Sequence, residues 1–252
     1  MDKLKCLQIN LNRSKAASQE LSNKSHEVVF MTEPMTSKRA DGSWKTTLAS
    51  NCSKWQVLSS EGNLRPTAAL RVSRHLHPWL VSCFTDGDVC IAAVKINGIL
   101  VYLCSLYLDI LESVQNKKFL EAVRWCEREK IPLVVGMDSN AHSPLWGSSD
   151  KNPRGEELED IFLVENLMVM NVGSVPTFQT SRAESVIDVT AINSWAQRWL
   201  TLEKWQVSKD PSFSDHNYIS FQFGSYDAPS EMFQNLKRAN WGLFRDKLSE
   251  AP

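Results

Sequence analysis

The chain has 252 residues, of which 42% are hydrophobic, and its formal net charge is −1. This length suits one large α/β domain or two small ones, and the hydrophobic content supports a well-buried core. A charge so close to zero lacks the basic excess of many nucleic-acid-binding domains, so any such contact would depend on local basic clusters. No apolar run approaches the roughly 18 to 20 residues of a membrane span, and the N-terminus lacks the apolar block of a signal peptide, so we expect no contact with membranes.

Cysteine usage points to thiols that pack in the core. The six cysteines form no C-x-x-C pair, and several lie inside apolar runs, which favours buried free thiols over zinc ligands or disulfides. They are Cys6, Cys52, Cys83, Cys90, Cys104 and Cys126.

Short β-rich runs occur throughout the first 223 residues of the chain. The dipeptide Asn97-Gly98 between runs Val89–Val94 and Ile99–Leu103 predicts a hairpin with a type I′ turn. Further predicted strands are Cys6–Asn10, Val28–Thr32, Trp55–Ser59, Ala68–Val72, Leu133–Met137, Leu167–Val172, Val186–Ile192 and Tyr218–Phe223.

Helical spacing of apolar residues predicts helices at Val114–Lys130 and Glu156–Asn166, and more weakly at Lys15–Lys24. Helices separated by several strands indicate an α/β fold of mixed sheets with helices packed outside them. From Gly224 the sequence turns polar, so we expect a domain over residues 1–223 and a linker over 224–252.

Polar and acidic side chains stand where the predicted strands begin or end. They are Asn10, Asn12, Glu33, Asp138, Asn140, Asp188, Asp215 and His216. Each one alone is also compatible with a turn or a cap, because such residues favour turns. Together they occupy positions where a rigid scaffold commonly presents functional groups.

Hydrolysis of a phosphodiester needs a hard cation, a base and a donor to the developing charge. Glu33 and Asp215 offer hard oxygen ligands suited to Mg²⁺. Asp138 could take a proton from the attacking water, and Asn140 could hold that water or a phosphate oxygen. His216 could donate to the phosphate oxygens.

Two further residues could assist this chemistry. Asp188, if it lies against the His216 imidazole, would orient the ring and raise its pKa. Tyr107 is an additional donor or simply an aromatic residue at the edge of a sheet. The fingerprints of serine hydrolases, P-loop proteins and dinucleotide-binding proteins are absent from the sequence, so we expect no small-molecule cofactor.

An ordered series of short motifs resembles the exonuclease/endonuclease/phosphatase superfamily. The motifs are QINLN (8–12), TEP (32–34), SLY (105–107), GMDSNAH (136–142), PTF (176–178), SVID (185–188) and SDH (214–216). Within that superfamily, NAHSPLWG (140–147) and RGEEL (154–158) look like the endonuclease of non-LTR (LINE-type) retrotransposons, and KRANWGLF (237–244) is similar to the segment that leads there toward the reverse transcriptase.

The resemblance implies a four-layer α/β sandwich like that of pancreatic DNase and apurinic/apyrimidinic endonucleases. It also implies an enzyme that uses Mg²⁺ or Mn²⁺ to nick a double-stranded chromosomal target in the nucleus, leaving a 3′-hydroxyl that primes reverse transcription. The reverse transcriptase domain of the same polyprotein would be its partner.

Carried over by position, the resemblance assigns a role to each matching residue. Glu33 would hold the metal with Asp215 beside it, and Asn10 and Tyr107 would contact the scissile phosphate. Asn12 stands where repair enzymes carry a second carboxylate. Asp138, Asn140, Asp188 and His216 would have the roles given above. Thr177, Arg182 and Ser185 would lie near the DNA, although a solvated loop explains the last two equally well.

Two other functions remain open at this point. A phosphatase of the same superfamily would use the same residues on phospholipids or inositol phosphates. A DNA-binding module without catalysis would keep the fold alone, and the presence of all the acidic and imidazole groups argues against it.

Overall fold

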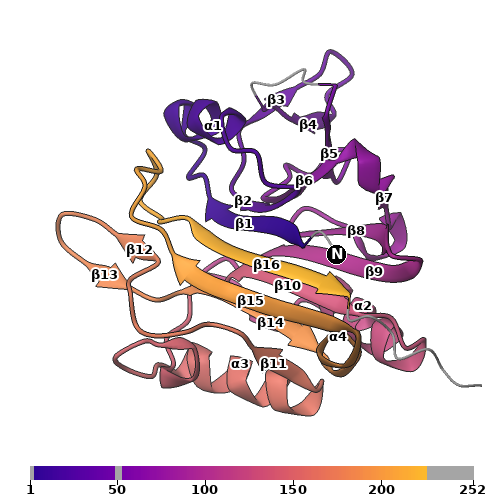
Figure 1. The fold of residues 1–252 in the computed structure, drawn as a ribbon. Helices are drawn as coiled ribbons and strands as arrows, with labels where there is room; N and C mark the ends of the chain where they lie inside the picture. Colours follow the sequence, from indigo (N-terminus) through magenta and orange to yellow (C-terminus); the bar gives the residue numbers. More distant parts are fainter. Residues whose placement is uncertain (1–2, 49–52, 226–252) are drawn as a thin grey trace, which may run out of the picture.

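Two six-stranded β-sheets lie face to face in the computed structural model, which describes residues 3–48 and 53–225 (Figure 1). The first sheet has the order β15 (Leu200–Val207), β16 (Ile219–Ser225), β1 (Leu4–Asn10), β2 (Val28–Thr32), β6 (Ala68–Ser73) and β5 (Trp55–Ser59). The second has the order β11 (Leu167–Val169), β14 (Asp188–Asn193), β10 (Leu133–Asp138), β9 (Ile99–Tyr107), β8 (Val89–Ile96) and β7 (Trp79–Leu80).

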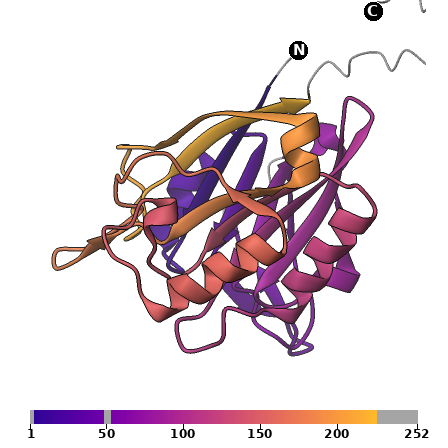
Figure 2. The same cartoon turned by 90° about the horizontal axis from the view of Figure 1, so that it is seen from below.

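Helices cover the outer faces of both sheets (Figures 1 and 2). Helix α1 (Lys15–Ser22) packs on the first sheet, whereas α2 (Lys117–Arg128) and α3 (Pro153–Val164) pack on the second. The short helix α4 (Ser194–Trp199) joins β14 to β15. The predicted four-layer α/β sandwich, with mixed and mostly antiparallel sheets, is confirmed.

The sequence of β1 shows why its strand is buried on both faces. Leu4 and Cys6 point between the sheets, and Leu7 and Ile9 point toward α1. A strand covered on both sides needs an almost continuous apolar sequence, and LKCLQIN approaches one. Lys5 is the exposed exception, and the buried polar residue Gln8 faces the second sheet.

Capping residues fix where the two long helices begin. Asn116 accepts a hydrogen bond from Phe119 N, so α2 starts three residues later than predicted. Asn152 accepts one from Gly155 N, and Pro153 follows it, so α3 starts three residues earlier than predicted. An asparagine cap followed by proline is a strong start signal because proline needs no amide partner in the first turn.

The predicted hairpin is confirmed. Strands β8 and β9 pair antiparallel, and Asn97 and Gly98 both have positive φ angles, 51° and 83°, as a type I′ turn requires. Free thiols are also confirmed for the described cysteines, of which Cys83 is exposed and the others are buried; Cys52 lies outside the described residues.

Several short elements escape the sequence patterns. They include the hairpins β3 (Thr36–Lys38) with β4 (Trp44–Thr46) and β12 (Phe178–Gln179) with β13 (Glu184–Ser185), three 3₁₀ segments (Arg74–Leu76, Ser82–Phe84 and Pro144–Trp146), and the longer β15 and α4. Of the predicted linker 224–252, the first two residues belong to β16 and the rest lies outside the described residues. None of the helices in the described part is long and apolar enough to cross a membrane.

Hydrogen bonds of the Gln8 side chain cross the apolar interior and fix the position of one sheet relative to the other. Gln8 Nε2 donates to the carbonyls of Met137 (3.0 Å) and Val189 (3.3 Å), and Thr190 Oγ1 donates to Gln8 Oε1 (2.9 Å). Gly136 makes room for this contact, since a Cβ there would lie 2.8 Å from Phe30 Cβ and 3.0 Å from Gln8 Oε1.

We expect Gly136→Ala to lower the free energy of unfolding by about 1–3 kcal/mol, because the methyl group would push the two sheets apart. Urea unfolding followed by circular dichroism measures this change. Gly224→Ala is the matched control, since the nearest atom to its new Cβ would be Lys3 Cγ at an ordinary 3.5 Å. Equal stability of the two variants would contradict the close approach at Gly136.

Candidate active site

Strand pairing gathers the predicted functional residues at one edge of the sandwich. Strands β1 and β2 run parallel and end together at Asn10 and Thr32, just before Glu33. In the second sheet, Asp138 pairs with Tyr107 on parallel β9 and with Asp188 on antiparallel β14. Because parallel strands end at the same edge, residues far apart in the sequence meet there.

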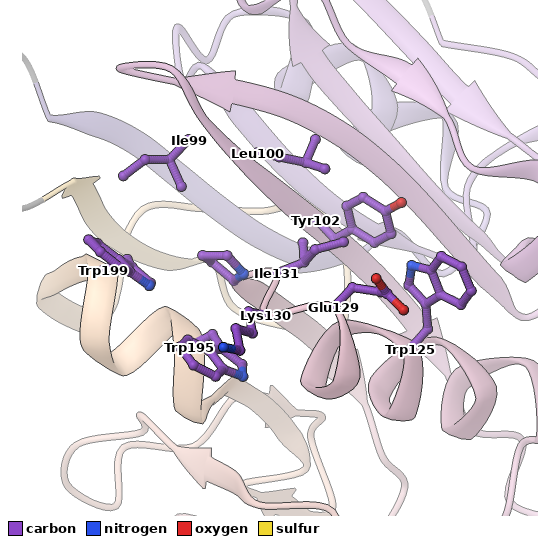
Figure 3. A pocket seen from close by; sticks show the side chains of 10 residues that line it. Ile99, Leu100, Tyr102, Trp125, Glu129, Lys130, Ile131, Trp195 and Trp199 are labelled. Carbon is purple, nitrogen blue, oxygen red and sulfur yellow. The ribbon is translucent and has the colours of Figure 1, made fainter.

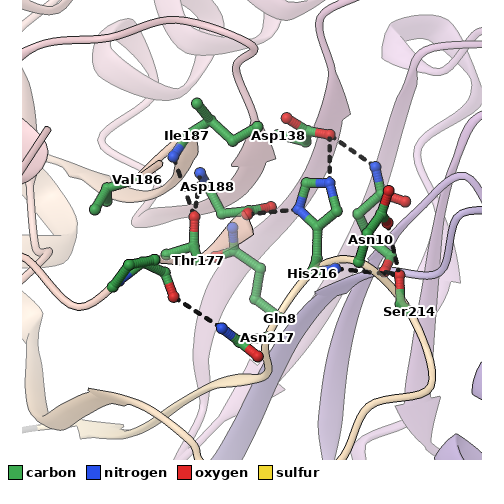
Figure 4. A network of polar contacts seen from close by, with 12 residues as sticks. Gln8, Asn10, Asp138, Thr177, Val186, Ile187, Asp188, Ser214, His216 and Asn217 are labelled. Carbon is green, nitrogen blue, oxygen red and sulfur yellow. Dashed lines mark hydrogen bonds and ion pairs between the residues drawn. The ribbon is translucent and has the colours of Figure 1, made fainter. Parts of the chain in front are cut away.

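Asp188 and His216 form a buried acid–imidazole pair (Figure 4). His216 Nδ1 lies 2.7 Å from Asp188 Oδ2, and both residues are at least 95% buried. On its other side, His216 Nε2 lies 3.9 Å from Asp138 Oδ2. The Phe178 ring stands edge-on to the imidazole, with centroids 5.1 Å apart. The ring is therefore held in one orientation between two carboxylates.

Asn10 connects the two sheets at the centre of the site. Its Nδ2 donates to Asp138 Oδ2 at 2.7 Å and lies 3.2 Å from Glu33 Oε2. The Asn140 backbone N–H donates to the other oxygen of Asp138 at 3.3 Å. These donors satisfy a carboxylate that water hardly reaches, which a buried charge requires.

Burial and neighbouring charge shift the pKa values of both central groups. Burial, followed by repulsion from Asp188, raises the pKa of Asp138 well above its ordinary value. Burial lowers the pKa of His216, but the charge and hydrogen bond of Asp188 and the charge of Asp138 outweigh it and raise that pKa to about 9. The imidazole is therefore a cation at neutral pH, as the sequence predicts for a histidine beside an acid.

The two remaining asparagines orient atoms at the rim of the site. Asn140 Nδ2 donates to Leu108 O at 3.1 Å, and this bond does not involve the side-chain carbonyl oxygen of Asn140. Asn12 Nδ2 donates to Asp215 Oδ2 at 3.0 Å, so these two predicted metal neighbours contact each other. Tyr107 is half-buried, and burial followed by the charges of Glu33 and Asp138 raises its pKa, so the phenol stays protonated.

Three residues join the site that the sequence analysis did not assign a role. Arg13 Nη2 forms an ion pair with Glu33 Oε1 at 2.8 Å. Ser214 Oγ donates to the Asn10 carbonyl, and Arg154 donates to the carbonyls of Leu108 and Ser139. Arg13 follows QINLN directly, Ser214 begins the motif SDH and Arg154 begins RGEEL, so all three stand at quoted motifs. Their contacts, however, depend on the tertiary structure.

The predicted DNA-facing residues occupy different environments. Thr177 is fully buried, and its hydroxyl accepts hydrogen bonds from the backbone amides of Ile187 and Asp188, so its side chain positions Asp188 and does not face solvent. Asn10 is likewise 2% exposed. Arg182 and Ser185 lie on the β12–β13 hairpin, which projects from the body of the molecule (Figure 1), and Arg182 is exposed.

Two groups of side chains could hold a metal ion. Asp138, Asp188 and His216 offer ligand atoms within 4.8 Å of one another, but Asp188 and the imidazole are already bonded to each other. Glu33, Asp215 and Asn12 are more accessible and offer hard oxygens. The Arg13 guanidinium beside Glu33 shows that this carboxylate can take a cationic partner, so the donor set fits a hard divalent ion.

Known proteins resemble this chain over most of its length. Residues 101–220 match a family model described as endonuclease-reverse transcriptase. The chain is 31% identical over 183 residues, 65% of its length, to a putative 115 kDa protein in the type-1 retrotransposable element R1DM of Drosophila melanogaster. It is 30% identical over 169 residues, 63% of its length, to a Pol polyprotein from the type-1 element R1 of Bradysia coprophila. The matches cover 17% and 16% of those proteins, so the chain spans only a small part of them.

Solved structures share the fold. The endonuclease domain of TRAS1, a telomere-specific non-LTR retrotransposon, superposes with a TM-score of 0.72 at 24% identity, covering 88% of this chain and 99% of that one. Together with the family model and the relatives in R1 elements, this match confirms the resemblance that the sequence motifs predict. The AP endonuclease LMAP of Leishmania major superposes with a TM-score of 0.67 at 10% identity, covering 89% and 88%. The chain thus has the DNase I-like fold that these structures share.

We expect the His216 imidazole to titrate near pH 9 in the metal-free protein, as followed by nuclear magnetic resonance of its ring protons. Asp188→Asn should lower that midpoint by more than one unit. Burial lowers the pKa of His216, and the variant lacks the negative charge of Asp188 that raises it. Asp150→Asn is the control, since Asp150 is exposed and pairs with His142 instead. A midpoint that Asp188→Asn leaves unchanged would contradict the pairing.

Proposed function

We propose that this chain is a divalent-metal-dependent endonuclease that nicks one strand of double-stranded DNA. The observation that carries the proposal is the continuous set of contacts from Asp188 through His216, Asp138 and Asn10 to Glu33 at one strand edge. It joins an imidazolium, a base-like carboxylate and an accessible acid within one site. The relatives in R1 elements supply the reason to choose nucleic acid as the substrate.

In this proposal Asp138 takes the proton from the attacking water. Its raised pKa makes it a better base than an ordinary carboxylate, and its hydrogen bonds from Asn10 and Asn140 hold the oxygens in place. The Asn140 carbonyl oxygen, oriented through the bond to Leu108, would accept the second hydrogen of that water.

His216 and Tyr107 stabilise the charge that develops on the phosphate. The imidazolium presents Nε2–H toward the space beside Asp138, while Asp188 holds Nδ1. The protonated phenol of Tyr107 lies across the same edge, next to Asp138 in the strand register. Donors fixed before the reaction need no reorganisation, which is the main source of such stabilisation.

Glu33 and Asp215, with Asn12, would hold the divalent ion, Mg²⁺ or Mn²⁺. When bound, such an ion neutralises charge on the phosphate oxygens and orients the group. Asn12 contributes an uncharged amide, so the site carries less negative charge than one with a third carboxylate. Arg13 adds a positive charge beside Glu33 and competes with the ion for it.

The product we propose is a nick with a free 3′-hydroxyl in a chromosomal target in the nucleus. That end would prime reverse transcription by a reverse transcriptase domain of the same polyprotein. The endonuclease-reverse transcriptase family model and the similarity to a Pol polyprotein support this proposal. Arg182 and Ser185, on the hairpin that begins at Phe178 beside His216, would contact the DNA on that side.

With Mg²⁺, the protein is expected to convert supercoiled plasmid to nicked circles that a DNA polymerase can extend. EDTA should abolish the reaction, and His216→Ala should slow it by about 10²–10³-fold, the usual cost of losing a transition-state donor. Gel electrophoresis over time gives the rates.

His75→Ala is the matched control, since His75 is exposed and outside the site, and it should retain the full rate. Nicking that persists at the full rate in His216→Ala would remove the histidine from the mechanism. DNA binding with no nicking by the wild-type protein would support a non-catalytic module, and release of phosphate from inositol phospholipids would support a phosphatase.

Measurements of metal binding should show which of two groups holds the ion: Glu33 with Asp215 and Asn12, or the buried group Asp138, Asp188 and His216. Glu33→Gln is expected to weaken Mn²⁺ binding by about tenfold or more, whereas Asp188→Asn should change it little. Arg13→Ala should strengthen binding, because it removes a competing cation from Glu33. Electron paramagnetic resonance of free Mn²⁺ measures all three without DNA. The opposite order, with Asp188 as the sensitive residue, would place the ion in the buried group.

A further inference from the structure

An aromatic hollow, whose lining is drawn in Figure 3, lies at the end of the second sheet that is opposite the candidate site. It has a volume of about 590 Å³ and is lined by Trp125 of α2, Trp195 and Trp199 of α4, and Tyr102, Leu100 and Ile99 of β9. Pro132, also in its lining, directly precedes β10, and Asp138 ends that strand. Six residues of strand span roughly 20 Å, so the hollow is separate from the catalytic residues.

The rest of the fold buries the three tryptophans only in part. Trp125 is 38% exposed, and Trp195 and Trp199 are half-buried. Their rings are approached by cations at the rim: Arg128 lies 4.7 Å from the Trp125 ring centre, and Lys130 lies 5.5 Å from that of Trp195. Aromatic side chains that gather around a hollow commonly mark a binding surface.

The described chain ends beside this hollow. Strand β16 pairs with β15 so that Ser225 lies opposite Leu200, and Leu200 directly follows Trp199. Residues 226–252 therefore start next to the wall of the hollow. A few extended residues would reach from Ser225 to the hollow, since an extended chain covers about 3.3–3.6 Å per residue.

The sequence after Ser225 carries the side chains that an aromatic hollow would accept. Its large apolar residues are Met232, Phe233, Leu236, Trp241, Leu243, Phe244 and Leu248. Trp241, Phe244 and Leu248 are spaced by three and four residues, the spacing that places side chains on one face of a helix. A plain linker has no need of so many apolar residues, because they favour burial.

We propose that residues 231–248 of the same chain bind in this hollow, with Trp241 and Phe244 against Trp125, Trp195 and Trp199. Binding within one chain does not depend on the protein concentration, because the short connection from Ser225 keeps residues 231–248 close to the hollow. The segment read from the sequence as a linker is therefore a docked part of the domain. The proposal is independent of the nuclease activity.

Hydrogen–deuterium exchange of the full 252-residue chain tests the proposal. We expect the amides of residues 231–248 to exchange about tenfold or more slowly than the same segment as a free peptide, which corresponds to a bound fraction of about 90%. Trp125→Glu and Phe244→Asp should each remove this protection and leave that of β10 unchanged. Leu163→Glu, which changes an exposed apolar residue of α3 outside the hollow, is the matched control and should keep the protection.

A second measurement identifies the occupant. A photo-crosslinking residue at position 244 should attach to α2, α4 or β9 of the same molecule, at a yield independent of protein concentration. Free exchange of residues 231–248, attachment elsewhere, or protection that rises with concentration together with a dimer in ultracentrifugation would each overturn the proposal. The last result would assign the hollow to a second copy of the chain.

Discussion

The hydrogen bond from Asn10 to Asp138 crosses from one sheet to the other, and the geometry of the candidate site depends on it. Both residues are 98% buried, so neither the amide nor the carboxylate has water as an alternative partner. A buried carboxylate without donors costs several kcal/mol. The fold offsets this cost with Asn10 and the Asn140 amide, and the cationic His216 supplies opposite charge. The same contacts that make the burial tolerable also place a carboxylate and an imidazole side by side.

Backbone conformation at the site adds a second constraint. Asn12, Arg13, Glu33 and Asn140 all have positive φ angles, between 43° and 52°. Asparagine tolerates this region, but for Arg13 and Glu33 it is strained by about 1–3 kcal/mol each. Hydrogen bonds hold these residues in place, from Arg13 N to Glu33 O and from Glu33 N to Thr67 O. Strain concentrated beside the proposed metal ligand is consistent with a site fixed before it binds substrate.

The sequence predicts most of the core strands because their apolar runs are local, and it predicts Glu33, Asp138, Asp188 and His216 because each stands next to such a run. Strand β15 was missed, since LTLEKWQV has charged residues on its exposed side and a bulge between Glu203 and Gln206. The pairing of Arg13 with Glu33 and the burial of Thr177 depend on loops that meet only in the folded chain. No spacing along the sequence encodes such meetings.

The Gln8 contact between the sheets ties the alignment of the site to the interior of the protein. Gln8 lies two residues before Asn10, and its partner Met137 immediately precedes Asp138. A change in the interior that shifts one sheet relative to the other would therefore also shift Asn10 relative to Asp138. A substitution in the interior of this domain would therefore affect the register of the two sheets at the candidate site as well as the stability of the fold.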